Sequence, residues 1–562
     1  MKASRVLFLA FLIILSLCAV NTQPVKSQFY GTIYINTDGS VSSSDNSTVP
    51  ILQVGNVYTF NGSIFDYSIV VQRDNIVIDG SGYTLQGTEE IDVGIDLSYR
   101  SNVTIRNMQM SGFECGIYLW NSLSNIISGN KIVSIFNGIM IQNASNNNII
   151  SVNNVTNCDT GIRIYSSLNN ELRNNMMNNR YNFAVYGTEL SHFVNDIDIS
   201  NTINGKKVYY LVRQSGLLIN PSTFPDLGFL ALVNCTNVVV QDQELANNGQ
   251  GVLMAFTTNS TITQNYITNN NIGVGLYSSS GNSISGNYIT KNDRGIQLSR
   301  ASKSNSISAN NITNNNNGIF LFESSQNTIN GNNMTNSNIG IGFSASSTNM
   351  IYHNYFVSNT RQVYDSNIDD ASVTLSVNYW DFGYPQGGNY WSDYTGVDAK
   401  SGSNQDQPGS DGIGDTPYII YENSKDNYPL MPYGSRPAIS ILSPENKTYT
   451  INYVPLTFTV SEPTSWIGYS LDKQTNVTIA GNTTLTGLSD GSHSLKVYAN
   501  DTDGKTGTSE TIYFTIAQAQ PHPSEPLPIT WIVAATAILA IGVVAVLVYF
   551  KRIKKPTRKV KK

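Results

Sequence analysis

The sequence predicts an all-β chain: a right-handed parallel β-helix with coils of 22–23 residues, then a small immunoglobulin-like β-sandwich and one transmembrane helix. Three observations lead to this fold class. A motif rich in asparagine and glycine recurs at a fixed period. Short segments of alternating apolar and polar residues follow the repeats, and an apolar run lies near the C-terminus.

The periodic motif is the strongest of the three observations. Counted from the asparagine that opens each unit, the units begin at Asn102, Asn125, Asn148 and Asn170, and after an interruption at Asn237, Asn259, Asn282, Asn305, Asn327 and Asn349. Steps of 22 or 23 residues are typical of a solenoid, in which each repeat buries its apolar side chains against its neighbours. We therefore expect a stack of coils.

Each unit contains three short apolar segments, such as those at Ile284, at Ile289 and at 296–298. Alternation of apolar and polar residues over a few positions indicates β-strands, and the sequence shows no stripe with the 3.6-residue period of a helix. Parallel stacking places isoleucine on isoleucine and asparagine on asparagine, so that turn amides can hydrogen-bond from coil to coil. The pattern therefore predicts three strands per coil.

Changes in composition divide the chain into eight segments. These are a signal peptide (1–27), an N-terminal cap with the first coils (28–100), the β-helix repeats (101–377, with an insertion at about 181–234), an aromatic and Asp-Gly-rich C-terminal cap (378–436), the immunoglobulin-like sandwich (437–517), a proline-rich stalk (518–528), the transmembrane helix (529–550) and a basic tail (551–562). An apolar run of this length followed by basic residues is typical of a membrane span with a cytoplasmic tail. We expect a single-pass protein of the cell membrane with a large extracellular N-terminal part.

Charge limits the class of partner. The formal net charge is −6, although the tail at 551–562 alone carries eight basic residues. The part outside the membrane is therefore more acidic than the whole chain. An acidic exterior disfavours nucleic acid as a partner, because the phosphate backbone is itself negative.

An aspartate-rich and glycine-rich loop is a candidate metal site. Asp406, Asp411 and Asp415 lie close together in the sequence, with glycines at 409, 412 and 414. Carboxylates are the hard oxygen ligands that calcium prefers, and glycine allows the chain to turn sharply around an ion. The loop predicts a structural calcium site; the alternative is a polar loop that binds no ion.

Aromatic residues crowd the segment just after the last repeat. Trp380, Tyr390 and Trp391 are its candidate carbohydrate-binding residues, because aromatic faces combine apolar area with a polar edge. Such clusters also close the exposed end of a solenoid core. The sequence favours the cap and leaves the sugar platform as an alternative.

Candidate catalytic residues are few. Glu114 and Asp159 occupy equivalent places just before the glycine of their coils, with Arg163 nearby. Two coils separate the carboxylates by about 10 Å at the usual strand spacing, which is wide for a catalytic pair. We interpret them as solvated turn residues and keep them as weak candidates only.

Several motifs together resemble a known family. The coils, the insertion NTINGKKVYY (201–210), the segment GNYWSDY (388–394) and the loop DGIGDTPY (411–418) are similar to NosD-type β-helix repeat proteins of archaeal cell surfaces that carry a C-terminal immunoglobulin-like domain. The resemblance covers about residues 30–435. It implies a parallel β-helix, and the family name implies periplasmic copper delivery to nitrous oxide reductase. The wider fold class includes carbohydrate-binding and sugar-cleaving proteins.

These features favour a non-catalytic surface protein. We expect it to recognise extracellular polysaccharide, or to associate with surface-layer components as part of the cell envelope. A polysaccharide lyase or glycoside hydrolase is the enzyme alternative, and it lacks a visible site. Copper delivery is the second alternative, but the four histidines are scattered over three segments and do not supply a copper ligand set.

The sandwich region holds three sequons that we expect to be glycosylated. They begin at Asn476, Asn482 and Asn500. The pattern Asn-X-Ser/Thr is the acceptor for N-glycosylation in exported proteins.

Overall fold

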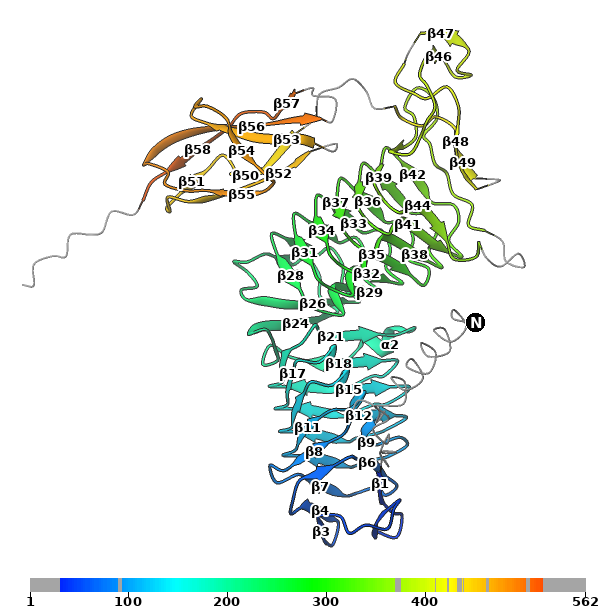
Figure 1. Ribbon diagram of the computed structural model, residues 1–562, viewed down its shortest axis with the longest axis vertical. Coiled ribbons are helices and arrows are strands. Elements are labelled where there is room, and N and C mark those ends of the chain that lie inside the picture. The colour runs from blue at the N-terminus through cyan, green and yellow to red at the C-terminus, as the bar shows by residue number, and fades with distance from the viewer. Residues whose placement is uncertain are drawn as a thin grey trace, which may run out of the picture. The chain divides into compact units, whose positions relative to one another are not determined.

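The computed structural model describes residues 31–518, apart from 89–92, 369–374, 410, 422–423, 432–436, 438, 461–463 and 502–505. The chain divides into two compact units, residues 1–434 and 435–562. The first unit is a stack of short parallel strands, and the second contains two small sheets (Figure 1). The predicted signal peptide, the predicted membrane span and the predicted basic tail lie outside the described residues.

Five long sheets form the walls of the first unit in the described part of the chain. Sheet 1 contains, in spatial order, β2 (Val41–Ser43), β1 (Gly31–Ile35), β6 (Tyr67–Val71), β9 (Val93–Asp96), β12 (Cys115–Trp120), β15 (Asn137–Gln142), β18 (Thr160–Tyr165) and β21 (Tyr181–Tyr186). Sheet 2 contains β22 (Asp196–Ile197), β19 (Glu171–Arg173), β16 (Ile149–Ser151), β13 (Ile126–Ser128), β10 (Thr104–Arg106), β7 (Val77–Asp79), β4 (Val57–Phe60) and β3 (Ile51–Val54).

Sheet 3 is the longest and runs through the whole unit. It contains β44 (Arg361–Asp365), β41 (Ile339–Ser344), β38 (Asn317–Phe322), β35 (Arg294–Ser299), β32 (Ile272–Tyr277), β29 (Gln250–Ala255), β26 (Leu227–Val233), β24 (Lys206–Val212), β23 (Thr202–Ile203), β20 (Met176–Asn178), β17 (Asn154–Thr156), β14 (Lys131–Val133), β11 (Gln109–Ser111), β8 (Thr84–Gln86) and β5 (Ile64–Phe65).

Sheets 4 and 5 complete the later coils. Sheet 4 contains β25 (Leu218–Ile219), β27 (Val239–Gln241), β30 (Thr261–Thr263), β33 (Ser283–Ser285), β36 (Ser306–Ser308), β39 (Thr328–Asn330) and β42 (Met350–Tyr352). Sheet 5 contains β28 (Glu244–Ala246), β31 (Tyr266–Thr268), β34 (Tyr288–Thr290), β37 (Asn311–Thr313), β40 (Asn333–Thr335), β43 (Tyr355–Val357) and β45 (Tyr390–Trp391). The pairs β46 (Lys400–Ser401) with β47 (Gln407–Pro408) and β48 (Tyr418–Tyr421) with β49 (Ser424–Asp426) follow.

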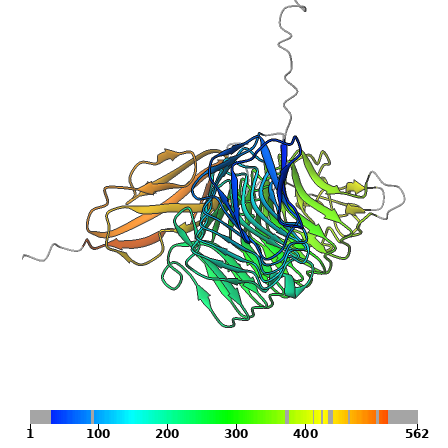
Figure 2. The ribbon, with the colours of Figure 1, turned by 90° about the horizontal axis from the view of Figure 1, so that it is seen from below.

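The prediction of three strands per coil is confirmed. Ile284, Ile289 and Ile296 lie in β33, β34 and β35, one in each wall of a coil, and all three are fully buried. Each pairs in parallel with an apolar residue 22 or 23 positions away, as Ile284 does with Ile262 and Ile307. The periodic isoleucines therefore form the aliphatic columns of a parallel β-helix, and Figure 2 shows the stack from the end at which the first coils lie.

Asparagine ladders connect the coils at the turns. The Nδ2 of Asn287 donates to the carbonyl oxygen of Ile262 (2.8 Å) and to the Oδ1 of Asn310 (2.9 Å), and its Oδ1 accepts from the backbone N–H of Asn265 (3.0 Å). The same geometry continues along a buried column: Asn265, Asn287, Asn310, Asn332, Asn354 and Asn389. Each amide thus satisfies backbone groups of a neighbouring coil that no strand ladder reaches.

Three of the predicted unit starts lie one residue too early. The backbone N–H groups of Val103, Val238 and Ser260 occupy the ladder position, and the N–H of Val103, for example, donates to Asn125 Oδ1 (2.9 Å). The preceding asparagines, Asn102, Asn237 and Asn259, have φ values of 57°, 54° and 50°. Asparagine tolerates this left-handed conformation, so it recurs in the turn for a reason other than the ladder.

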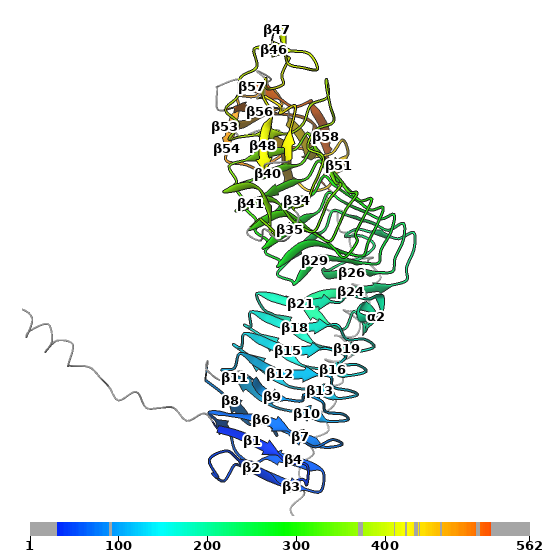
Figure 3. The ribbon, with the colours of Figure 1, turned by 90° about the vertical axis from the view of Figure 1, so that its right-hand side faces the viewer.

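A hairpin inside the insertion reverses the chain. β23 and β24 pair antiparallel across Asn204 and Gly205, both of which have positive φ. An Asn-Gly pair with this conformation forms the two-residue turn that suits a β-hairpin. Before the hairpin the long strands of the coils lie in sheet 1, and after it they lie in sheet 3. We call the coils up to β22 the first stack and those from β24 onward the second stack (Figure 3).

The two stacks share a wall at the bend between them. All seven residues of β26 are buried. Phe229, Ala231 and Val233 belong to the core of the first stack, and Leu230 and Leu232 belong to the core of the second. A strand that is buried on both faces has apolar residues at successive positions of its sequence. This explains why the repeat pattern is interrupted here.

The predicted fold class requires one correction. In the part of the chain that the structure describes, no helix is long and apolar enough to cross a membrane. The one α-helix with described bounds is the short α2 (Leu190–Phe193). The fold class that the structure supports is therefore an all-β parallel β-solenoid, and residues 529–550, the predicted transmembrane helix, lie outside the described residues.

The second unit is built from antiparallel strands. One sheet contains β50 (Ile439–Ser443), β52 (Val454–Val460) and β55 (Thr483–Leu485), and the other contains β51 (Thr448–Tyr449), β58 (Ile512–Ile516), β56 (Gly491–Asp501), β53 (Thr464–Leu471) and β54 (Val477–Ile479), with β57 (Thr506–Thr508) paired to β56. Buried residues of both sheets, such as Leu456 and Val497, form one core. The immunoglobulin-like assignment stays a prediction.

Candidate glycan-binding site

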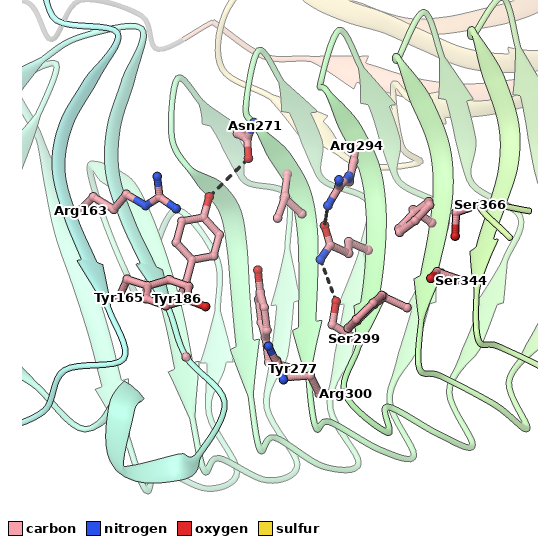
Figure 4. Close-up of a pocket in the computed structure, with 15 residues that line it drawn as sticks. Arg163, Tyr165, Tyr186, Asn271, Tyr277, Arg294, Ser299, Arg300, Ser344 and Ser366 are labelled. Carbon is pink, nitrogen blue, oxygen red and sulfur yellow. Dashed lines mark hydrogen bonds between the residues drawn. The ribbon is translucent and has the colours of Figure 1, made fainter. Parts of the chain in front are cut away.

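A hollow of about 550 Å³ lies where the two stacks meet (Figure 4). Its residues come from β18 and β21 of the first stack and from β32, β35, β38 and β41 of the second. It is lined by Arg163, Tyr165, Tyr186, Gly187, Asn271, Ile272, Tyr277, Arg294, Gln297, Ser299, Arg300, Phe320, Phe322, Ser344 and Ser366. The long strands of both stacks therefore contribute to one continuous surface.

Strand alternation directs the lining side chains outward. In β18, Ile162 and Ile164 are fully buried, whereas Arg163 and Tyr165 between and after them are only partly buried. Successive side chains of a strand point to opposite faces, so the fourth and sixth residues of β18 face away from its core. The same positions supply Gln297 to the hollow from β35.

Side-chain and backbone bonds hold the bend in place. The Oε1 of Gln250 accepts from the N–H of Val185 (3.3 Å), and its Nε2 donates to the carbonyl oxygen of the same residue (3.2 Å). The amide of Gln250 thus pairs with the edge of β21 as a neighbouring strand would. Next to it, a Cβ on Gly249 would lie 2.3 Å from the Cβ of Ala184, so only glycine permits this close approach.

Two arginines stack on aromatic rings inside the hollow. The guanidinium of Arg163 lies 5.1 Å from the ring centre of Tyr186, and that of Arg294 lies 4.9 Å from the ring centre of Phe320. Arg294 also donates from Nη1 to the Oε1 of Gln297 (2.7 Å). Cation–π contacts and this hydrogen bond fix both cations in one orientation.

Tyrosines form the floor of the hollow. The hydroxyl of Tyr186 donates to the Oδ1 of Asn271 (3.3 Å), which ties the first stack to the second, and its ring meets that of Tyr277 edge to face at 6.4 Å. Burial raises the pKa of Tyr186 to about 12 and raises the pKa of Tyr277 as well. Both phenols therefore stay neutral and serve as aromatic surface and hydrogen-bonding groups.

A second, more polar hollow of about 460 Å³ shares Asn271 with the first. Arg180, Lys291 and Asp293 line it, together with asparagines of the neighbouring coils. Asp293 accepts a hydrogen bond at Oδ1 from the Nδ2 of Asn316 (2.8 Å). The two hollows together extend the polar and aromatic surface across the bend.

The weak catalytic candidates are not brought together as an acid pair. Glu114 and Asp159 precede β12 and β18, two coils apart as expected from the sequence. Asp159 forms an ion pair with Arg180 (2.9 Å). Of the three candidates, Arg163 lines the hollow, and none of the described residues that line it is aspartate or glutamate.

The aspartates of the candidate calcium loop accept hydrogen bonds, Asp411 and Asp415 from backbone groups and Asp406 from a side chain. Asp411 accepts from the N–H groups of Gly402 (3.2 Å) and Ile413 (3.1 Å), and Asp415 accepts from that of Lys400 (3.0 Å). Asp406 accepts from the Nε2 of Gln407 (3.0 Å). Among the described residues, no group of three or more His, Cys, Asp or Glu side chains is arranged to hold a metal ion. Calcium binding stays a prediction.

Trp380 and Trp391 are buried where the second stack ends, with 3% and 2% of their surface exposed. The ring of Trp391 lies between those of Phe356 (4.4 Å) and Tyr418 (4.3 Å), nearly parallel to both. Both faces of this ring are therefore covered and cannot contact a sugar. Tyr390 is partly buried and its ring lies 5.7 Å from that of Tyr355.

A buried carboxyl group supports these rings. Asp426 is fully buried, and its Oδ2 accepts from the N–H of Asn389 (2.7 Å) and from the Nε1 of Trp391 (2.9 Å). Asn389 is the last member of the asparagine ladder, so the carboxyl group closes that column. Burial raises the pKa of Asp426 from 3.8 to about 7 against these hydrogen bonds.

The raised pKa predicts a pH-dependent stability. Because the folded chain holds the proton of Asp426 more tightly than the unfolded chain, this stabilisation is complete below about pH 4 and is lost as the pH rises through 7. Urea unfolding of the wild type and of Asp426→Asn between pH 4 and 8 measures the effect. We expect the stability difference between them to change by up to roughly 4 kcal/mol over this range; parallel pH profiles would contradict the prediction.

The predicted glycosylation sites lie at or near the surface of the second unit. Asn476 and Asn482 are exposed, and Asn500 is partly buried. Asn482 accepts at Oδ1 from the N–H of Phe458 (3.1 Å), and Asn500 accepts from the hydroxyl of Thr506 (2.7 Å). Glycosylation at these positions stays a prediction.

The fold and the surface at the bend define a parallel β-helix protein with an arginine-rich and aromatic hollow on its long-strand face. The chain belongs to the NosD family, described as periplasmic copper-binding protein, which matches residues 21–210, 194–318 and 226–396. The predicted resemblance to the NosD family is thereby confirmed, whereas the archaeal cell-surface type and the immunoglobulin-like domain stay predictions. No curated protein matches the sequence.

Several solved structures are similar to the chain. They include the A-module of the mannuronan C-5 epimerase AlgE6 of Azotobacter vinelandii (12% identity, 57% of this chain and 88% of that chain covered, TM-score 0.23), the DFA-IIIase of Arthrobacter chlorophenolicus A6 without its lid (11%, 56% and 74%, TM-score 0.22) and an alginate lyase of Paenibacillus sp. str. FPU-7 (12%, 53% and 91%, TM-score 0.17). At these identities and TM-scores, the similarity says nothing about a reaction or ligand of this chain.

Several residues of the hollow were not predicted as site residues. In the sequence, the aromatic residues of the hollow cannot be distinguished one at a time from ordinary strand residues; these are Tyr165, Tyr186, Tyr277 and Phe320. In the six-residue strands that line the hollow, the fourth or sixth position supplies residues such as Arg163, Tyr186 and Phe320. An alignment of these strands is the sequence signal that identifies the outward face.

Proposed function

We propose that the chain binds an extracellular polysaccharide, without cleaving it, in the hollow at the bend of the β-helix. The observation that carries the proposal is the combination of aromatic rings with hydrogen-bonding side chains in one concave surface. Aromatic faces pack against the apolar face of a sugar, while the polar groups bind its hydroxyls. A volume of about 550 Å³ is also of the size that ligand sites commonly have.

The lining supports binding better than cleavage. Hydrolysis of a glycosidic bond generally uses a pair of carboxyl groups, one as acid and one as base or nucleophile. The described lining residues provide arginines, tyrosines, serines and amides instead. Since the phenol of Tyr186 has a pKa of about 12, it is a poor base at neutral pH.

A depletion experiment tests this function. The purified full chain is incubated with a panel of soluble polysaccharides, and the supernatant is analysed for both lost polymer and released oligosaccharide. We expect depletion of at least one polymer without fragments. In the variant Phe320→Ala the affinity for that polymer should fall about tenfold, because a sugar-facing ring is removed.

The control for this experiment is Tyr379→Ala. Tyr379 is 60% exposed and lies beyond the last repeat, away from the residues that line the hollow. Its replacement should leave the affinity unchanged. Release of oligosaccharides, or equal binding by the wild type and Phe320→Ala, would overturn the proposal.

A further inference from the structure

The hollow is cationic in a chain that is acidic overall. Arg163, Arg294 and Arg300 line it, and the described lining includes no carboxylate. The nearest acidic residue in sequence, Asp293, lines the neighbouring hollow and is hydrogen-bonded to Asn316. With a formal net charge of −6, a positive concave surface is a local exception. Such a surface concentrates anionic ligands.

Aromatic contacts orient the two principal arginines so that a ligand can bind in the plane of each guanidinium group. Arg163 lies over the rings of Tyr186 (5.1 Å) and Tyr165 (6.0 Å), and Arg294 lies over Phe320 (4.9 Å). Stacking covers a face of the guanidinium and leaves its N–H groups, which point outward in the plane, to bind an acceptor. Figure 4 shows both side chains extended along the surface of the hollow.

Each of these arginines also has a buried donor without a partner. The Nε atoms of Arg163 and Arg294 are buried, and the structure shows no hydrogen-bond acceptor for either. A buried donor left unpaired costs about 1–3 kcal/mol. A ligand from solvent does not reach the enclosed Nε atoms, so a carboxylate or sulfate group accepts from the Nη atoms at the ends of the two guanidinium groups. An oxyanion is the ligand group whose charge and acceptor atoms match these donors.

We infer that the polysaccharide bound at the bend is anionic, and that Arg163 and Arg294 bind carboxylate or sulfate groups on its sugars. This inference rests on the proposed function of the same hollow. Gln297 positions Arg294: it accepts from Arg294 Nη1 and donates from its Nε2 to the Oγ of Ser299 (2.7 Å). The aromatic rings contact the sugar rings, and the two guanidinium groups, on strands of different stacks, select charged units.

Pairs of polymers that share a sugar backbone and differ in charge distinguish recognition of the charge from recognition of the sugar. Binding of the purified full chain to polygalacturonate is compared with binding to its methyl ester, which has the same backbone without the charge. We expect at least tenfold tighter binding to polygalacturonate. In Arg163→Gln and in Arg294→Gln this preference should fall at least fivefold, while binding to the methyl ester changes little. Dextran sulfate and dextran form the second pair, which distinguishes sulfate from carboxylate.

Controls keep the outcomes distinct. Lys303→Gln removes one positive charge at an exposed position outside the hollow and should keep the full preference. Thermal unfolding of each variant identifies loss of fold. Equal binding of the charged and neutral polymers by the wild type would overturn the inference and leave the proposed function standing. Failure to bind any polymer in the broad panel would overturn the proposed function itself.

Discussion

Replacing Asn310 with alanine should destabilise the β-helix by about 3–5 kcal/mol, whereas the same replacement at the adjacent Asn311 should cost less than about 1 kcal/mol. Asn310 is 1% exposed and donates from Nδ2 to the carbonyl oxygen of Ile284 (2.8 Å) and to Asn332 Oδ1 (2.9 Å). Its Oδ1 accepts from the backbone N–H of Asn287 (3.0 Å). The truncation leaves several buried groups unsatisfied, each at a cost of about 1–3 kcal/mol.

Asn311 is the matched control. It lies in β37 directly after the ladder residue and is partly exposed on the outer face of the strand. Urea unfolding followed by far-ultraviolet circular dichroism compares the two variants in the same coil. If Asn310→Ala and Asn311→Ala unfold at the same urea concentration, the ladders do not stabilise the stack and the interpretation of the repeat is wrong.

Replacing Trp391 with alanine should be the most damaging change at the C-terminal end of the second stack. The ring is 2% exposed between Phe356 and Tyr418, and its Nε1 donates to the buried Asp426. Removal of a buried tryptophan costs about 3–5 kcal/mol through lost contacts and the remaining cavity. The variant also deprives a buried carboxyl group of a donor, which adds to that cost.

Limited proteolysis together with thermal unfolding measures this effect. We expect Trp391→Ala to be cleaved faster than the wild type between β43 and β49 and to unfold at lower temperature. Tyr379→Ala, which removes an exposed ring from the same segment, should behave like the wild type. Normal stability of Trp391→Ala combined with weaker polysaccharide binding would instead support a sugar-binding role for the ring.

The repeats could be predicted from the sequence because the coils share one arrangement of strands, turns and stacked side chains. Residues such as Ile289 and Asn287 recur at the same place in neighbouring coils, since parallel stacking places like residues on one another. The turn asparagines Asn102 and Asn259 shifted the predicted starts by one residue. Asparagine satisfies both the ladder and the left-handed turn, and sequence alone does not separate the two uses.

The bend and its hollow depend on contacts that the repeat pattern of the sequence does not predict. Tyr186 and Asn271 are 85 positions apart and meet only because the chain reverses at Asn204 and Gly205. That Asn-Gly pair is a hairpin signal, yet the sequence does not show that the hairpin moves the long strands from one wall to another. The pairing of Gln250 with the edge of β21 is equally invisible, because it uses a single side chain.

The two interpretations of the aromatic segment also could not be separated by sequence. Trp380 and Trp391 are as suitable for a sugar platform as for a cap. Their roles depend on residues far along the chain, namely Ser424 and Asp426, which accept hydrogen bonds from the two indole N–H groups at 2.8 and 2.9 Å.

Hydroxyl-radical footprinting of the full chain, with and without a bound polysaccharide, tests most directly whether the ligand lies at the bend. Oxidation of Tyr165 and Phe320, read by mass spectrometry, should fall several-fold when the polymer is bound. Tyr379 and Tyr513, which are 60% and 56% exposed and lie outside the hollow, should be oxidised equally in both states. Protection of Tyr379 or Tyr513 with no change at Tyr165 and Phe320 would place the ligand elsewhere and contradict a binding site at the bend.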